Sequence, residues 1–166
     1  RLRVRDFLAK NAKRVDAAGD EESQDGETVD YLTGARVWQN SLFDAGFSGL
    51  SWPKEYGGQS LTMHHQRVFN EEANGYVMPS SPFMVTLGMC APTLLQYGTE
   101  EQRRTHVPKM LRGDEIWCQL FSEPGAGSDV AGLTTKAVRD GDEWVINGQK
   151  VWTSGAHFAD YGLIVT

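Results

Sequence analysis

Residues 116–137 read IWCQLFSEPGAGSDVAGLTTKA, in which an apolar run gives way to a glycine-rich loop. Three common motifs do not fit this loop. A phosphate-binding P-loop would end in Gly-Lys-Ser or Gly-Lys-Thr, and the loop has no lysine. A dinucleotide fingerprint would need glycine at the position that Val130 occupies. A nucleophile elbow is also excluded, because the residues two places either side of Ser128 are Ala126 and Val130 and not glycines.

The same loop nevertheless contains the residue types of a ligand-binding turn. Gly125 and Gly127 allow a ligand to approach the backbone closely, and Ser122 and Ser128 add hydroxyl groups. A run of backbone amides can also form a concave anion site. The residues alone leave two interpretations open, a plain structural turn and a ligand-binding loop.

Upstream of this loop the apolar residues have helical spacing. Val15 belongs to the apolar face expected for the first helix, and Ser60 or Thr62 is the expected N-cap of the third. Thr99 and Gln102 fit a capping box, in which each side chain bonds the other residue's amide. The helices expected from this spacing cover residues 1–15, 29–45, 62–74, 82–97 and 100–112. In the fourth of these helices we expect a kink or break at Pro92 and an end at Gly98. The acidic stretch 16–27 is expected to be a solvated loop.

Downstream the period changes to that of strands. The Asp140-Gly141 turn predicts a hairpin. The strands expected are 116–121, 134–138, 143–146, 150–153 and 162–165, with a second turn at Asn147-Gly148. The predicted fold class is therefore an all-α helical N-terminal domain over residues 1–114, followed by an incomplete antiparallel β domain over residues 115–166.

Composition limits the function. The 166 residues include 16 basic and 22 acidic side chains, a formal net charge of -6, so no attraction to nucleic acid is expected. Cys90 and Cys118 are too few for a disulfide framework, and no apolar run reaches the ~20 residues of a membrane span. We therefore expect a cytoplasmic protein. No metal site is expected either, because the adjacent His64 and His65 point about 100° apart on a helix.

Four stretches resemble landmarks of the acyl-CoA dehydrogenase family. They are residues 52–58, 97–103, 122–137 and 141–156, which follow one another in the family's order. The resemblance implies the family's fold: a helical N-terminal domain, a β domain and a C-terminal helical domain, with FAD between the last two. It also implies α,β-dehydrogenation of an acyl-CoA thioester, in which a glutamate removes the α-proton and hydride leaves the β-carbon for the flavin.

The resemblance also implies which residues contact FAD. The residues carried over are Gln119, Leu120, Phe121, Ser122, Gly127 and Ser128 from the first flavin-contacting segment, and Trp152, Thr153 and Ser154 from the second. Ser122 and Ser154 keep a hydroxyl where the family usually has threonine, and Trp152 matches the tryptophan that packs on the flavin. Ser128 is also expected near the CoA-bearing substrate. No catalytic residue is assigned, because the family's base belongs to the C-terminal helical domain and Glu123 matches a loop acid that is not the base.

Three interpretations of function follow. The first is the N-terminal portion of an FAD-dependent acyl-CoA dehydrogenase, inactive as an isolated chain, with acyl-CoA as substrate and an electron-transfer flavoprotein as acceptor. In this case a homo- or hetero-oligomer is expected. The apolar residues Phe83, Met84, Leu87 and Met89 are first of all expected in the core, and the resemblance adds a second interpretation, in which the helix over 82–97 lines the acyl pocket. The second is a non-catalytic partner subunit or acyl-CoA-binding module of the same fold, which the replacements around the flavin site suggest. The third is a related acyl-CoA oxidase that passes electrons to oxygen.

Overall fold

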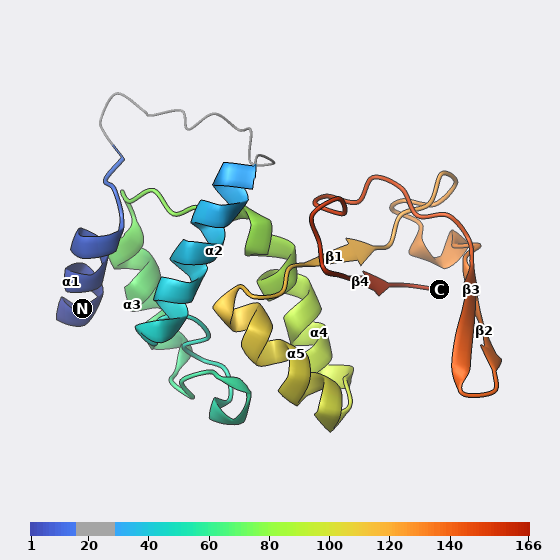
Figure 1. Ribbon diagram of the computed structural model, residues 1–166, viewed down its shortest axis with the longest axis horizontal. Helices are drawn as coiled ribbons and strands as arrows, with labels where there is room; N and C mark the ends of the chain where they lie inside the picture. The colour runs from blue at the N-terminus through green and yellow to red at the C-terminus, as the bar shows by residue number, and fades with distance from the viewer. Residues whose placement is uncertain (16–28) are drawn as a thin grey trace.

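Helices form one side of the molecule and strands the other (Figure 1). The computed structural model describes residues 1–15 and 29–166, so the acidic stretch predicted as a loop lies outside the described residues. The helical side contains α1 (Leu2–Asn11), α2 (Val29–Asp44), η1 (Lys54–Tyr56), α3 (Met63–Ala73), η2 (Ser81–Phe83), η3 (Thr86–Cys90), α4 (Ala91–Tyr97) and α5 (Glu100–Arg112). The other side contains β1 (Trp117–Leu120), η4 (Val130–Gly132), β2 (Lys136–Asp140), β3 (Glu143–Asn147) and β4 (Tyr161–Ile164). The helical N-terminal part followed by a partial β part confirms the expected fold class.

The helices bury the apolar faces that their spacing predicts. Val4 and Leu8 of α1 share one core cluster with Trp38 of α2. The expectation that Val15 belongs to the same helical face is wrong, because α1 ends four residues earlier, at Asn11. Val15 is exposed, and its N–H donates to the carbonyl oxygen of Gly75 at 2.9 Å.

The region predicted as one helix over residues 82–97 is divided into three kinds of turn. η2 is a 3-10 helix, η3 is a π-helix, and only α4 is α-helical. The π-helix ends at Cys90, two residues before Pro92, whose missing N–H and bulky ring disturb the preceding turn of a regular helix. The irregularity expected at this proline is therefore present as a change of helix type.

Most of the predicted helix ends are confirmed. Gly46 follows α2 with φ 74°, and α5 begins with the complete capping box of Thr99 and Gln102. Thr62 precedes α3, but its side chain makes no capping bond to that helix. Its hydroxyl instead bonds Nδ1 of His65 at 3.0 Å. Thr62 is the N-cap residue, as predicted, but it makes no side-chain capping bond.

The strands form two separate pairs. β2 and β3 make the antiparallel hairpin that was predicted, with Val138 opposite Val145. β1 and β4 pair in parallel, with Trp117 opposite Tyr161, so the expectation of an antiparallel sheet is wrong for this pair. A parallel pairing requires a long crossover, and the chain between Leu120 and β4 provides one.

Residues 150–153 do not form the predicted strand. Trp152 has φ 54°, in the left-handed region, and a strand requires extended backbone. The predicted second turn at Asn147-Gly148 is also wrong, because Asn147 is the last residue of β3 and an irregular segment follows it. Other contacts must hold this segment in place.

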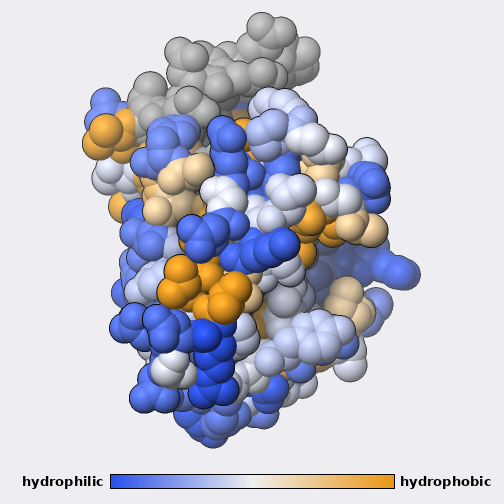
Figure 2. Space-filling view, turned by 90° about the vertical axis from the view of Figure 1, so that its right-hand side faces the viewer, coloured by the Kyte–Doolittle hydropathy of each residue, from blue (hydrophilic) through white to orange (hydrophobic). Residues whose placement is uncertain are grey.

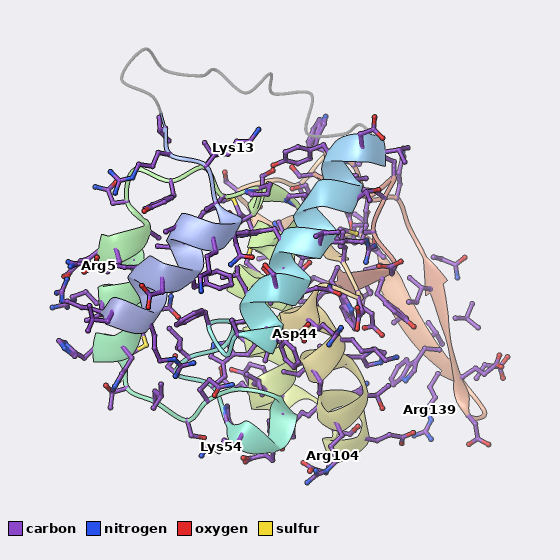
Figure 3. The ribbon with its side chains drawn as sticks, turned by 60° about the vertical axis from the view of Figure 1, so that its left-hand side comes forward. Arg5, Lys13, Asp44, Lys54, Arg104 and Arg139 are labelled. Atoms are coloured by element: carbon purple, nitrogen blue, oxygen red, sulfur yellow. The ribbon has the colours of Figure 1, made fainter. Side chains whose placement is uncertain are left out.

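The surface is charged around its edge and partly apolar on the strand side. Arg5 on α1, Lys54 on η1, Arg104 on α5 and Arg139 on β2 lie at the outer edge in Figure 3. Figure 2 looks onto the strand side and shows a hydrophobic patch among hydrophilic side chains. The exposed apolar side chains of the hairpin are Val138, Trp144, Val145 and Ile146. No helix among the described residues has both the length and the apolar character to cross a bilayer.

Candidate functional site

The start of β1 is fixed against the helical side by Thr86 of η3. The N–H of Trp117 donates to Oγ1 of Thr86 at 2.8 Å, and the same hydroxyl donates to the carbonyl oxygen of Trp117 at 3.1 Å. Cys90 Sγ donates to the carbonyl oxygen of Cys118 at 3.6 Å. The helices therefore fix the first two residues of β1, directly before Gln119, where the predicted cofactor residues begin.

Asp160 and Arg36 hold the loop before β4. One carboxylate oxygen of Asp160 accepts from the N–H of Ile116 at 2.8 Å and from Nη2 of Arg36 at 3.2 Å. Arg36 also donates to the carbonyl oxygens of Gly113 and Asp114, at 2.8 and 2.9 Å. The loop is thus tied to α2 and to the turn between α5 and β1.

The buried carboxylate of Glu115 lies between α5 and β1. It accepts from Nδ1 of His106 at 2.8 Å and from Nε1 of Trp117 and Nζ of Lys109, each at 3.1 Å. Burial raises the pKa of Glu115, but these three contacts outweigh burial and the net pKa is lowered. The carboxylate is therefore ionised and occupied by protein donors, as expected for a structural role.

The carboxylate of Glu123 is the most completely bonded group beside the glycine-rich loop. Its Oε2 accepts from the N–H and from Oγ1 of Thr134, both at 2.7 Å, and its Oε1 accepts from the N–H of Thr135 at 2.9 Å. Bonds from Thr135 and Thr134 hold the pKa of Glu123 well below its ordinary value, although burial acts against them. The Glu123 carboxylate is therefore held in its ionised form, with both oxygens occupied by protein donors.

Lys150 joins the two predicted flavin-contacting segments. Its Nζ donates to the carbonyl oxygen of Phe121 and to Oε1 of Glu123, both at 2.9 Å. The side chains of Lys150 and Glu123 are 7% and 3% exposed. The N–H of Val151 adds a bond to the carbonyl oxygen of Ser122 at 2.9 Å. The structure thus brings residues 121–123 and 150–151 side by side.

The remaining predicted site residues lie on either side of this junction. Gln119 and Leu120 belong to β1, Phe121 and Ser122 follow it half-buried, Gly127 and Ser128 lie exposed in the loop, and Trp152, Thr153 and Ser154 lie in the irregular segment before β4. Trp152 is 77% exposed in a backbone conformation that bulky residues rarely adopt, and such outliers cluster at functional sites.

Three features of these residues fit a large, partly polar ligand. Oε1 of Gln119 is buried and has no hydrogen-bond partner among residues 1–15 and 29–166. A Cβ added at Gly125 or Gly127 would meet nothing within 4 Å, so the loop backbone is open to close approach. The indole of Trp152 offers an exposed aromatic face.

Comparison with known proteins identifies the family. The profile described as "Acyl-CoA dehydrogenase, N-terminal domain" matches residues 1–114, and "Acyl-CoA dehydrogenase, middle domain" matches residues 118–166. The chain belongs to the acyl-CoA dehydrogenase family.

Individual members of the acyl-CoA dehydrogenase family match nearly the whole chain. "Acyl-CoA dehydrogenase IpdE1" of Mycobacterium tuberculosis is 40% identical over 168 residues, which cover 99% of this chain and 43% of that protein. The crystal structure of the ChsE4-ChsE5 complex of the same organism has a TM-score of 0.72 at 37% identity, covering 98% of this chain and 40% of that one. A structure described as "Tcur3481-Tcur3483 steroid ACAD G363A variant" has a TM-score of 0.74 at 39% identity, covering 97% and 42%. The chain thus spans less than half the length of these acyl-CoA dehydrogenases.

In this acyl-CoA dehydrogenase chain, Ser154 lies where the strand side meets η2 and η3. A cavity of about 80 Å³ separates them, and its lining includes Ser154 and Gly155 together with Pro82, Val85 and Cys118. The segment that resembles the family's acyl-pocket helix is therefore next to one of the predicted flavin contacts. Sequence reasoning expected both elements but not that they would share a cavity.

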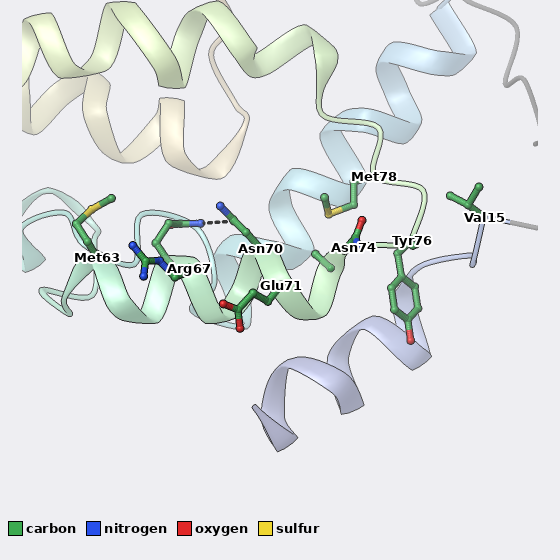
Figure 4. A pocket seen from close by; sticks show the side chains of 11 residues that line it. Val15, Met63, Arg67, Asn70, Glu71, Asn74, Tyr76 and Met78 are labelled. Carbon is green, nitrogen blue, oxygen red and sulfur yellow. Dashed lines mark hydrogen bonds between the residues drawn. The ribbon is translucent and has the colours of Figure 1, made fainter.

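A larger groove lies elsewhere. It has a volume of about 890 Å³, runs along α3 and the residues that follow it as far as Met78, and includes Val15 (Figure 4). Nε2 of Gln66 donates to Oδ1 of Asn70 at 3.0 Å on its wall. None of the predicted cofactor residues lines this groove, so its size does not make it the acyl-CoA dehydrogenase site.

Two residues that sequence reasoning missed are Thr86 and Lys150. Lys150 had no signal in the sequence, because a lysine between Gln149 and Val151 is ordinary and its burial beside Glu123 is visible only in the structure. Thr86 had none, because a threonine in an apolar helix is ordinary. Among the described residues there is also no group of three or more histidine, cysteine, aspartate or glutamate side chains arranged to hold a metal ion.

Proposed function

We propose that this chain is the N-terminal portion of an FAD-dependent acyl-CoA dehydrogenase that catalyses α,β-dehydrogenation of an acyl-CoA thioester. The observation that carries the proposal is the contact between the two family segments, made by Lys150 with the carbonyl oxygen of Phe121 and by Val151 with that of Ser122. Membership of the family supplies the reaction class.

The residues of this chain bind and orient. We propose that FAD is held by the residues carried over from the family: Gln119, Leu120, Phe121, Ser122, Gly127, Ser128, Trp152, Thr153 and Ser154. When bound, FAD accepts the hydride that leaves the β-carbon of the substrate. The hydroxyls of Ser122 and Ser154 are available as hydrogen-bond donors, Trp152 offers an aromatic face, and Ser128 is proposed also to contact the CoA-bearing substrate.

The general base is proposed to lie in the C-terminal helical domain that the family has. Glu123 is unsuited to this role, because a base must reach the proton it removes and have a pKa near the working pH. The Glu123 carboxylate is buried, fully bonded, and has a pKa far below its ordinary value. We therefore propose that residues 1–166 alone do not turn over acyl-CoA.

The substrate is proposed to be an acyl-CoA, with a steroid-derived acyl group as the first class to test. The support is the 39% identical structure described as a steroid ACAD. A hetero-oligomer is proposed because the descriptions of that structure and of the ChsE4-ChsE5 complex each name two different proteins. A cytoplasmic location is proposed because Cys90 and Cys118 are both free thiols.

The test is the visible spectrum of the complete protein, expressed with any partner subunit encoded beside it. We expect a bound-flavin spectrum that bleaches when acyl-CoA is added anaerobically, with steroid side-chain and linear fatty acyl thioesters compared at equal concentration. Residues 1–166 expressed alone are the control and should show no turnover. Absence of flavin from the complete protein, together with absence of bleaching, would refute the proposal.

The same experiment separates the alternatives. A non-catalytic partner subunit or acyl-CoA-binding module would bind acyl-CoA without bleaching any flavin, and the rest of its sequence would lack a glutamate base. An acyl-CoA oxidase would release peroxide in air. A dehydrogenase would instead pass its electrons to an electron-transfer flavoprotein, which we propose as the acceptor.

A further inference from the structure

We propose that the ion pair of Lys150 and Glu123, here called the Lys150–Glu123 clamp, is a positioning device that sets the two flavin-contacting segments relative to each other. The inference rests on the proposed function, since the segments matter only if a flavin binds between them. Neither residue is proposed to touch the cofactor. The clamp holds the backbone of Phe121, and through the chain it positions Ser122, next to Glu123, and Trp152, two residues after Lys150.

The clamp is needed because the second segment has no strand ladder. Residues 150–153 are not in a strand, and the left-handed backbone of Trp152 interrupts any extended pairing. One backbone bond, from the N–H of Val151 to the carbonyl oxygen of Ser122, joins the two segments. A single bond leaves rotation about it free. The bond from Nζ of Lys150 to the carbonyl oxygen of Phe121, one residue away on each segment, removes that freedom.

Glu123 makes this arrangement specific. Its Oε1 fixes the ammonium group of Lys150, and its other oxygen is occupied by two donors from Thr134. The N–H of Thr135, immediately before β2, is the fourth donor. Three segments far apart in the chain therefore meet at one carboxylate. The ammonium group of Lys150 is held between the carbonyl oxygen of Phe121 and Oε1 of Glu123.

The burial of the pair favours positioning over plain stabilisation. Both side chains are almost completely removed from water. For such pairs the loss of hydration offsets most of the attraction, and well-packed apolar residues of similar size often stabilise a fold as well. An apolar pair could not make the directed hydrogen bonds that fix residue 150 relative to Phe121. Ser122 and Trp152, the predicted contacts nearest the clamp, are each within two residues of one of its members.

The experiment uses the complete FAD-bound protein and three variants, Lys150→Met, Glu123→Gln and Lys150→Arg. The matched controls are Lys136→Met and Glu143→Gln, which change exposed side chains on the β2–β3 hairpin. FAD affinity is measured by titrating each apoprotein, and the visible circular dichroism of the bound flavin reports its orientation. The thermal midpoint of each apoprotein is measured in parallel.

We expect K150M and E123Q each to raise the FAD dissociation constant about tenfold and to alter the flavin dichroism. K150R should lose less affinity than K150M, because arginine keeps a cationic donor, but it should not reach wild type, because the planar guanidinium is larger than the buried ammonium group. The double variant K150M/E123Q should lose less affinity than the two single losses combined, since both remove the same clamp. If K150M does not fold, Thr134→Val replaces it, because that change removes one hydroxyl bond to Glu123 and preserves the side-chain volume.

Two results would overturn the clamp. In the first, K150M and E123Q lower the thermal midpoint but keep the FAD affinity and dichroism of the controls, which makes the pair merely structural. In the second, FAD affinity is unchanged and the flavin midpoint potential moves in opposite directions in the two variants, which makes it an effect of charge alone. A wild-type protein that binds no FAD refutes the proposed function and the clamp together. A wild-type protein that binds FAD, beside variants that behave as the controls, refutes the clamp alone.

Discussion

Replacing Thr86 with valine should loosen β1 from the helical side. The Thr86 hydroxyl is fully buried, accepts from the N–H of Trp117 at 2.8 Å and donates to the carbonyl oxygen of Trp117 at 3.1 Å. Valine preserves the volume but removes both bonds, leaving a buried N–H without an acceptor. Such a group costs about 1–3 kcal/mol. The carbonyl has a second lone pair and loses less, so we expect T86V to lower the free energy of unfolding by about 1–3 kcal/mol.

Thr86→Ser is the matched control, because serine keeps the hydroxyl and loses only a methyl group, worth about 1 kcal/mol. Urea denaturation followed by circular dichroism measures both variants. Hydrogen exchange adds a local readout: the Trp117 amide should lose protection in T86V and keep it in T86S. Wild-type stability and an unchanged Trp117 exchange rate in T86V would refute this reasoning.

Three further predictions concern the helical side. In denaturant titrations Gly113→Ala should lower the free energy of unfolding by about 1–3 kcal/mol more than Gly75→Ala does. Both glycines have positive φ, but only at Gly113 would the new Cβ lie 2.8 Å from Cγ of Gln39. Thr99→Ala should lower stability by about 1 kcal/mol and Thr99→Ser by less, measured by thermal unfolding, because only alanine removes the capping oxygen. Burial raises the pKa of Cys90 to about 11 from 9.0, so folding favours its neutral thiol. The free energy of unfolding should therefore fall as pH rises between these two values. Cys90→Ala should flatten that part of the curve of stability against pH, and an equally steep fall in the variant would contradict this reasoning.

The helical part was predictable because its signals are local. The capping box of Thr99 and Gln102 lies within four residues, and Gly46 marks a helix end by its positive φ. Gly98 ends α4 in an extended conformation, where an added Cβ would lie 2.6 Å from the carbonyl oxygen of Leu94. The strand predicted over residues 150–153 failed for the opposite reason. An alternating pattern reports only that a segment could pair, and the conformation of Trp152 prevents that pairing.

The candidate site was predictable only in part. The resemblance supplied the two flavin-contacting segments, and family membership supports that assignment. It did not supply the partners that hold them. Lys150 and Glu123 are 27 positions apart, and Thr86 and Trp117 are 31 apart. Bonds between distant residues depend on the finished packing, and neither periodicity nor composition carries information about them.

These contacts share a physical cause in the shortness of β1. A four-residue strand with one neighbour, β4, makes few ladder bonds, so side chains supply the rest. Thr86 bonds the N–H of Trp117 at the first residue of the strand, and Lys150 bonds the carbonyl oxygen of Phe121 just beyond its last. The first half of β1 is buried and the second half is only partly covered, so the strand passes from core to site within its own length. A change at Thr86 therefore acts on the same strand that carries Gln119, a predicted flavin contact, which makes the helical side part of the candidate site's geometry and not only its support.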